Sequence, residues 1–279
     1  MPLTQGLRQM AEEGSGIVVT IGDDAVARVK IDRAEVANSL SPLARDALTD
    51  AFLRVNNDPA VRAVLLTAAG TRHFCAGAGL ASPASPSPPP EKRPGDVARM
   101  LKGGWQRLVS SVLDCDKPVV AAVKGTAAGA GVSLLLACDL VVMSTEATLV
   151  AAFVHRGILP DSGAVHLLTR IVGLRKATEL LMLGEPVDAV TCERLGLVNR
   201  VVDLDETDAA AEELALRLAA GPTAMLGLTK RLLAVSSESG RDCAFEQEAW
   251  AQEVVSHTAD LQEGLSSFAE RRKPRFSGH

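Results

Sequence analysis

Tyrosine is absent from this sequence of 279 residues, and aromatic residues make up only 3% of it. Proteins that bind single-stranded nucleic acid usually offer several aromatic side chains on which bases stack, so we do not expect that function. A basic surface is missing as well, because 29 lysines and arginines are outnumbered by 34 aspartates and glutamates. The formal net charge of −5 therefore argues against nucleic acid as a partner.

Long apolar runs are also missing. The longest, around residues 131–138, is far too short to span a bilayer, and we expect no membrane association. The N-terminal stretch MPLTQGLRQMAEEG carries charges and lacks the apolar centre of a secretory signal. The five cysteines form no CxxC pair, which is typical of reduced thiols in a cytoplasmic protein. No His/Cys cluster has metal-ligand spacing, so no metal is expected.

The first half of the chain alternates between strand and helix patterns. Apolar residues recur at helical spacing in 40–55, where Ser41 and Pro42 form a cap and first turn. A second, short apolar helix follows a glycine turn within 125–137. Strands are predicted as a pair around a GDD turn in 17–31, and singly in 61–68, 117–123 and 138–143. This alternation predicts an α/β fold with a parallel sheet.

The second half of the chain reads as almost wholly helical. Gly184, Gly196 and Gly221 stand where helices should end. The predicted helices cover 161–171, 173–183, 189–195, 206–219, 222–236, 242–256 and 260–271. We therefore expect an α/β core over 1–204 and a helical region over 205–279.

One segment fits neither pattern. ASPASPSPPPEKRPG, at 81–95, is rich in proline and serine and cannot form a regular element. It indicates a mobile or extended loop, which is either a tolerated surface insertion or a lid over a ligand site.

Several motifs resemble, in order along residues 17–276, those of the crotonase or enoyl-CoA hydratase/isomerase superfamily. They are FCAGAGL (74–80), KPVVAAVKGTAAGAGVSLLLACDLVV (117–142), GILPDSGAVHLLTRIVG (157–173), LGEPVDAVTCERLGLVNRVV (183–202) and EGLSSFAERRKPRF (263–276). The resemblance implies a crotonase-like ββα spiral core with a helical C-terminal trimerisation region. It also implies a homotrimer or a hexamer built as a dimer of trimers.

The two glycine-rich motifs have a chemical rationale in that family. An acyl thioester that loses an α-proton places negative charge on its carbonyl oxygen, and two fixed backbone N–H groups can stabilise that charge. By resemblance, the donors are the amides of Ala78 and Ala130. Alanine serves as well as glycine there if its φ angle stays negative. The alternative for each motif is an ordinary glycine-rich turn that packs a helix on a sheet.

The resemblance further implies an acyl-CoA substrate, with coenzyme A as part of the thioester and no permanently bound cofactor. Gly79 replaces an aspartate of the family, which removes a polar contact to the adenine. Phe268 and Arg271 match positions that often reach coenzyme A from a neighbouring subunit; otherwise they are a core phenylalanine and a solvated charge. The full set is Glu35, Val36 and Ala37 at the coenzyme A entrance, Ala76, Gly79 and Leu80 near the adenine, and Phe268 and Arg271.

Hydratases of the family use two glutamates to activate a water and deliver a proton. Ser133 and Phe153 stand at those two positions in this sequence. Asp161 remains, at a position where several isomerases of the family carry a catalytic aspartate. One acid suffices for a 1,3-proton shift, and an apolar wall that includes Phe153 would strengthen it as a base. From the local sequence alone, the favoured interpretation of Asp161 is an N-cap of the helix that follows.

We therefore predict an enoyl-CoA isomerase that uses Asp161 as its single acid/base, with weak or no hydratase activity. Two alternatives stay open. The chain is a non-catalytic acyl-CoA-binding protein, or it is an acyl-CoA hydrolase in which Asp161 is the nucleophile and His155 the base. His166, on the helix after Asp161, is expected to pack or to face solvent.

Overall fold

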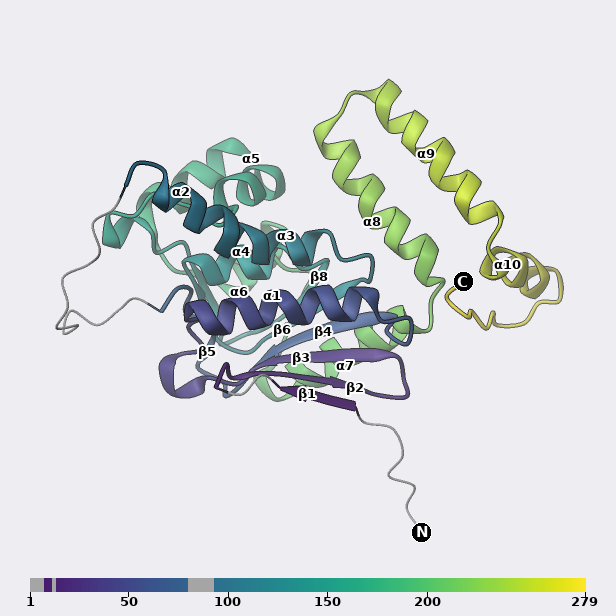
Figure 1. Cartoon of the computed structure of the whole chain (residues 1–279), viewed down its shortest axis with the longest axis horizontal. Helices are drawn as coiled ribbons and strands as arrows, with labels where there is room; N and C mark the ends of the chain where they lie inside the picture. Colours follow the sequence, from purple (N-terminus) through teal and green to yellow (C-terminus); the bar gives the residue numbers. More distant parts are fainter. Residues whose placement is uncertain (1–7, 12–13, 80–92) are drawn as a thin grey trace, which may run out of the picture.

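The computed structural model describes residues 8–11, 14–79 and 93–279. Its main element is a seven-stranded sheet in the order β1-β2-β3-β4-β6-β8-β11 (Figure 1). The first three strands pair antiparallel and all later neighbours pair parallel. The strands are β1 (Arg8–Ala11), β2 (Ile17–Ile21), β3 (Val26–Ile31), β4 (Ala63–Ala68), β6 (Val119–Val123), β8 (Leu140–Ser144) and β11 (Arg200–Val202). The predicted α/β fold with a parallel sheet is confirmed.

The central strands are covered on both faces, which explains why they read as continuous apolar runs. In β4, Val64 and Leu66 belong to the larger core, whereas Ala63 and Leu65 belong to a second core on the opposite face. Small side chains of α7 (Thr207–Ala219) fill that second core. The period-2 geometry of a strand thus sends alternate residues of one short apolar run into two different cores.

A second, four-stranded sheet has the order β10-β9-β7-β5. Its first three members in the chain, β5 (His73–Cys75), β7 (Thr126–Ala128) and β9 (Thr148–Val150), are parallel neighbours. The fourth, β10 (Val187–Asp188), pairs antiparallel with β9. The sequence patterns did not predict this sheet, because strands of two or three residues are too short to show alternation.

The helices follow the expected positions closely. Ser41 caps α1, accepting a hydrogen bond from the Ala44 amide at 3.2 Å, and Gly184 ends α5 in the left-handed conformation. Gly173 (φ 74°, ψ 164°) divides α5 at the predicted break. The helices are α1 (Pro42–Asn57), α2 (Asp96–Leu101), the π-helix η2 (Lys102–Gln106), α3 (Arg107–Leu113), α4 (Ala130–Leu136), α5 (Ala164–Leu183), α6 (Ala189–Arg194), α7, α8 (Thr223–Glu238), α9 (Arg241–Ser256) and α10 (Ala259–Ala269), with 3₁₀ turns η1 (Ala34–Val36), η3 (Val154–Arg156) and η4 (Leu204–Glu206). The helical stretch formed by α2, η2 and α3 was not expected from the sequence.

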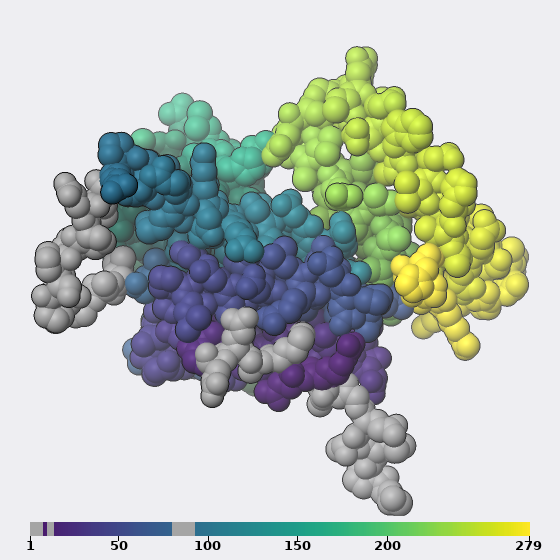
Figure 2. Space-filling model, viewed as in Figure 1, coloured from purple at the N-terminus to yellow at the C-terminus, as the bar shows by residue number. Residues whose placement is uncertain are grey.

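The C-terminal helices α8, α9 and α10 stand out from the body as an arm (Figures 1 and 2). α7 does not belong to this arm, since it packs on the sheet. The predicted boundary between residues 204 and 205 precedes α7. No helix within the described ranges has the length and hydropathy needed to cross a bilayer.

Candidate active site

The predicted site residues follow three neighbouring parallel strands of the small sheet. Ala78 comes three residues after β5, Ala130 comes two residues after β7, and the segment that leads to Asp161 leaves β9. The register pairs Cys75 with Ala127 and Ala128 with Val150, so the three strands end level with one another. The carboxyl edge of a parallel sheet is where ligands of open α/β folds usually bind.

Two glycines bring the Ala78 and Ala130 segments into direct contact. A β-carbon added at Gly77 would lie 2.8 Å from the Ala128 carbonyl oxygen and 3.0 Å from the Ala130 nitrogen. A β-carbon added at Gly131 would lie 2.1 Å from the Cys75 carbonyl oxygen. Both approaches are shorter than a side chain permits, so glycine is required for the two backbones to meet.

Of the amides of Ala76, Ala78 and Gly79, two donate to backbone carbonyls within the described residues. The Ala76 and Gly79 amides donate to the carbonyl oxygens of Ala37 and Leu40, each at 3.1 Å. Within the described residues, the Ala78 amide donates to no backbone carbonyl in the loops and turns. The Ala130 amide is the first of α4, before the hydrogen bonds of that helix begin. Neither alanine has a positive φ angle, as the proposed role requires.

The Asp161 side chain does not cap the helix that follows it. α5 begins at Ala164, its N-cap position is Gly163, and no side chain makes a capping hydrogen bond there. The N-cap interpretation of Asp161 is therefore wrong. Its carboxylate Oδ1 instead accepts a hydrogen bond from the Ser162 hydroxyl at 2.7 Å. Oδ2 has no hydrogen-bond or ion-pair partner among the residues that the structure describes, and Asp161 is partly exposed.

The two positions that carry glutamates in hydratases are buried here. Ser133 on α4 is 0% exposed, and its hydroxyl is the one buried side-chain oxygen or nitrogen without a hydrogen-bond partner in the described part of the chain. Phe153 is 6% exposed and packs against Ala151 and Ala164, the first residue of α5. Ala164, against which Phe153 packs, follows Asp161 by three residues in the chain.

The residues expected at the coenzyme A entrance lie beside the Ala76 segment. Glu35 and Val36 are exposed in η1, and the Ala37 carbonyl accepts the Ala76 amide. The buried Asn38 side chain, which the sequence analysis did not single out, donates to the carbonyl oxygens of Ala69 (2.9 Å) and His73 (2.7 Å). It therefore ties the entrance segment to the loop that leads into β5. Gly79 is exposed, and a β-carbon added there would lie 3.6 Å from the Ser39 hydroxyl oxygen.

Leu80 and most of the predicted loop at 81–95 lie outside the described residues. Phe268 lies in α10, and Arg271 comes two residues after the end of that helix. α10 lies at the end of the C-terminal arm, on the opposite side of the molecule from β5 (Figure 1). Phe268 is 85% exposed, so it is not a core phenylalanine. One chain alone does not bring Phe268 and Arg271 to the Ala78 segment.

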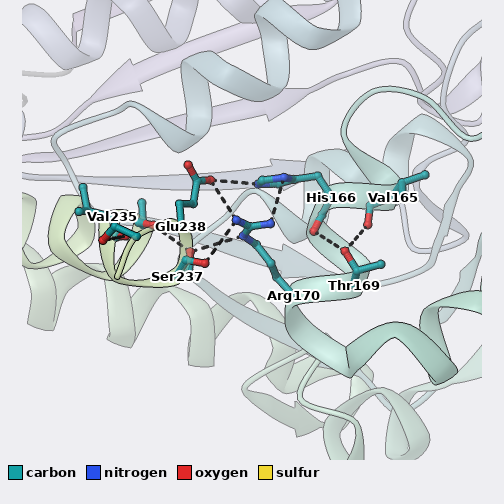
Figure 3. A network of polar contacts seen from close by, with 9 residues as sticks. Val165, His166, Thr169, Arg170, Val235, Ser237 and Glu238 are labelled. Carbon is teal, nitrogen blue, oxygen red and sulfur yellow. Dashed lines mark hydrogen bonds and ion pairs between the residues drawn. The ribbon is translucent and has the colours of Figure 1, made fainter. Parts of the chain in front are cut away.

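The histidines near Asp161 in sequence have structural partners. His155 Nε2 donates to the Gly184 carbonyl at 3.0 Å, which fastens η3 to the end of α5. His166 is exposed and belongs to a polar network with Arg170 on the same helix and with Glu238 on α8 (Figure 3). That network links α5 to the C-terminal arm. Of the two positions expected for His166, packed or facing solvent, the structure shows the second.

No thiol near the site has the character of a nucleophile. Cys75 ends β5 and is fully buried, and burial raises the pKa of its thiol to about 12. A thiol in such surroundings stays protonated at neutral pH and reacts slowly. Across the described ranges, no group of three or more His, Cys, Asp or Glu side chains is close enough together to hold a metal ion.

Comparisons with known proteins identify the family of the chain. Residues 22–279 match the model of the enoyl-CoA hydratase/isomerase family. The chain is 34% identical, over 92% of its length and 96% of the relative's, to 1,2-epoxyphenylacetyl-CoA isomerase of Escherichia coli (strain K12). It is 33% identical to carnitinyl-CoA dehydratase of Proteus mirabilis, over 91% of this chain and 95% of the relative.

Among solved structures, an enoyl-CoA hydratase from Bacillus anthracis superposes with a TM-score of 0.87 at 30% identity. The match covers 95% of this chain and 100% of that chain. A family model over nearly the whole length, relatives above 30% identity and a shared fold agree. This chain belongs to the enoyl-CoA hydratase/isomerase family.

Proposed function

We propose that this protein is an acyl-CoA isomerase that shifts the double bond of an enoyl-CoA, with Asp161 as its single acid/base. The observation that carries the proposal is the exposure of the side chains at the two hydratase glutamate positions and at Asp161. Ser133 and Phe153 are buried and cannot exchange protons with a substrate, whereas Asp161 is partly exposed with one carboxylate oxygen free.

The proposed reaction is a 1,3-proton shift. Asp161 removes a proton from Cα of a 3-enoyl thioester, and the electron pair of that C–H bond delocalises over the dienolate. The amides of Ala78 and Ala130 stabilise the negative charge on the thioester oxygen, an effect that usually amounts to several kcal/mol. Asp161 then returns the proton to Cγ, so that the double bond ends between Cα and Cβ and no other reactant is needed.

The hydrolase alternative leaves His155 with only its Nδ1 as a base. A carboxylate nucleophile needs a base that activates water for the second step, and His155 was the candidate. Its Nε2 donates to the Gly184 carbonyl, so that nitrogen carries a hydrogen and is engaged elsewhere. The hydratase alternative lacks a second carboxylate with which to position water.

A panel of three substrates tests the proposal. We expect conversion of a 3-enoyl-CoA, little hydration of a 2-enoyl-CoA, and no release of coenzyme A from a saturated acyl-CoA. Free coenzyme A would indicate a hydrolase, and saturable binding without turnover would indicate a binding protein. Rapid hydration of the 2-enoyl-CoA would contradict the proposal directly.

The variant Asp161→Asn tests the assigned base. It keeps the size of the side chain and removes its basicity, so isomerisation should fall on the order of 100-fold or more with little change in melting temperature or acyl-CoA binding. Asp188 is the matched control, because it does cap a helix, accepting the Thr191 amide at 2.7 Å. Asp188→Ala should lower the melting temperature and leave turnover unchanged.

We further propose that the active form is a homotrimer or a hexamer that binds acyl-CoA between subunits. The support is the arm, whose exposed apolar side chains have no cover in one chain: Leu233, Phe245, Trp250, Val254, Leu265 and Phe268. Light scattering should give three or six times the chain mass of 29.2 kDa. A monomer at micromolar concentration would contradict this.

Calorimetry with a long-chain acyl-CoA should show saturable binding, and Phe268→Asp should weaken it if the arm of one subunit reaches the site of another. The absence of any heat at millimolar ligand would remove the basis for an acyl-CoA site. We place the protein in the cytoplasm, on the support of five free cysteines of which four are buried.

A further inference from the structure

We propose that Ser162 is a positioning residue, whose hydroxyl holds the Asp161 carboxylate in the orientation needed for proton transfer. The inference rests on the proposed function of Asp161 and names the group on which that function depends. Nothing in the sequence motif pointed to this serine, because small polar residues are ordinary in turns.

Residues 161–164 form a tight turn of an uncommon kind. The Ala164 amide donates to the Asp161 carbonyl at 2.9 Å, and the two central residues, Ser162 and Gly163, both have positive φ angles, 55° and 85°. Two positive φ angles define a type I′ turn, in which glycine, asparagine and aspartate are favoured at the first central position. Serine at that position is strained, since its β-carbon crowds the backbone.

The strained conformation makes the hydrogen bond to Asp161 attainable. In an extended chain, neighbouring side chains point to opposite sides, so the Ser162 hydroxyl would be far from the Asp161 carboxylate. The turn brings them to the same side, and the hydroxyl donates to Oδ1 at 2.7 Å. Glycine would relieve the strain and lose this bond. The hydroxyl is therefore the feature that distinguishes serine from glycine at this position.

The turn is held rigidly by its surroundings. Ser162 and Ala164 are both 0% exposed. A β-carbon at Gly163 would lie 3.6 Å from Val109 on α3, so that helix packs directly against the turn. Ala164 packs against Phe153. Because the Ser162 side chain is buried, its hydroxyl is held in one position, and through the hydrogen bond it holds the Asp161 carboxylate in place.

The consequence for the reaction is a division of labour between the two carboxylate oxygens. Oδ1 is engaged with Ser162, and Oδ2 is left free for the proton on the substrate. Without the hydroxyl, the carboxylate rotates among several rotamers, and only some of them point Oδ2 at the substrate. Loss of such pre-orientation lowers the rate of the chemical step and hardly affects the binding of coenzyme A.

The test compares Ser162→Gly with the wild type in the full-length protein, using a 3-enoyl-CoA. We expect kcat to fall about 10- to 100-fold, KM to stay within about twofold, and the melting temperature to stay equal or rise, because glycine suits the turn. Ala25→Gly is the matched control, since Ala25 also has a positive φ angle, 60°, in the hairpin between β2 and β3. It should leave kcat unchanged.

A double variant separates positioning from a structural role. If Ser162 acts through Asp161, adding Ser162→Gly to Asp161→Asn should lower kcat no further, whereas independent effects would multiply. Ser162→Cys, of similar size and with a weak S–H donor, should recover part of the lost kcat. The exchange of α-protons of a saturated acyl-CoA into D₂O provides a second measure of the same proton transfer.

The outcomes distinguish the two proposals. If the wild type isomerises and Asp161→Asn does not, but Ser162→Gly retains full kcat or lowers kcat only together with stability, the positioning role is wrong and the proposed function stands. If the wild type neither isomerises 3-enoyl-CoA nor exchanges α-protons, or Asp161→Asn keeps its turnover, the proposed function fails and the role of Ser162 fails with it.

Discussion

Replacing Ser133 by alanine should make the protein more stable, although it deletes a polar group from the core. The Ser133 hydroxyl is fully buried without a hydrogen-bond partner, and such a group costs about 1–3 kcal/mol. Alanine is also the better helix former by about 0.5 kcal/mol. The void left by one oxygen, roughly 10–15 Å³, costs only about 0.3 kcal/mol. The net gain should be about 1–3 kcal/mol.

For a chain of 279 residues, that gain corresponds to a rise in melting temperature of about 2–5 °C. Differential scanning calorimetry at one fixed protein concentration measures it, because association also shifts the melting temperature. Ser111 on α3 is the matched control: it is 8% exposed, and its hydroxyl donates to the Leu108 carbonyl at 2.7 Å. Ser111→Ala should be less stabilising than Ser133→Ala by about 1–3 kcal/mol.

Turnover of Ser133→Ala should equal that of the wild type, since a side chain without exposed surface cannot touch a substrate. A lower melting temperature than that of the wild type would refute the reasoning, because the hydroxyl would then have a partner. Lost turnover at unchanged stability would show instead that Ser133 takes part in the reaction, contrary to the single-acid mechanism.

Three further perturbations test the site and its support. Gly131→Ala should lower the melting temperature and reduce kcat about 100-fold, since its β-carbon would lie 2.1 Å from the Cys75 carbonyl oxygen. In the control Gly103→Ala, the added β-carbon has no atom within 4 Å, so melting temperature and kcat should both stay unchanged. His155→Ala should cost about 1 kcal/mol in a denaturant titration and leave kcat unchanged; lost turnover would restore His155 as a candidate base. Burial raises the pKa of Asp139, and its ion pair with Lys230 (2.8 Å) opposes that rise, so Lys230→Met should raise this pKa further. A carboxyl whose pKa is raised in the folded state adds stability at low pH, and that contribution is lost as pH rises through the raised pKa. Lys230→Met should therefore lower the free energy of unfolding, on the order of 1–3 kcal/mol, and the loss should be larger at pH 8 than at pH 4. Asp139→Asn should abolish this pH dependence.

The sequence predicted most of the long elements, because each repeats its pattern over several residues; the helical stretch formed by α2, η2 and α3 is the exception. Helix α1 shows a helical apolar period over four turns and starts at a serine cap, and both features appear in the structure. The small sheet has no comparable signal: β5, β7 and β9 have three residues each, and only pairing with neighbours defines them. The sheet that positions the candidate site was therefore the part least visible to periodicity.

The site itself was predicted unevenly. Ala78, Ala130 and Asp161 were named from motif resemblance, and the structure places their segments after adjacent strands of one sheet. The capping role considered for Asp161 was wrong, because two positive φ angles at Ser162 and Gly163 delay the helix to Ala164. Sequence patterns favour a cap for an aspartate before a helix, and they carry no information about φ at a following serine.

The two halves of the proposed chemistry are under different physical constraints. The oxyanion donors are backbone groups, so their geometry depends on Gly77 and Gly131, where a β-carbon would strike another backbone, while Ala78 and Ala130 themselves carry side chains. The acid is a side chain, and it depends on what stands beside it. Exchanging the residues at positions 133, 153 and 161 can therefore change the reaction while the charge-stabilising backbone stays in place. With serine and phenylalanine buried at the first two positions, the proposed proton transfer depends on the Asp161 carboxylate, which accepts a hydrogen bond from the Ser162 hydroxyl.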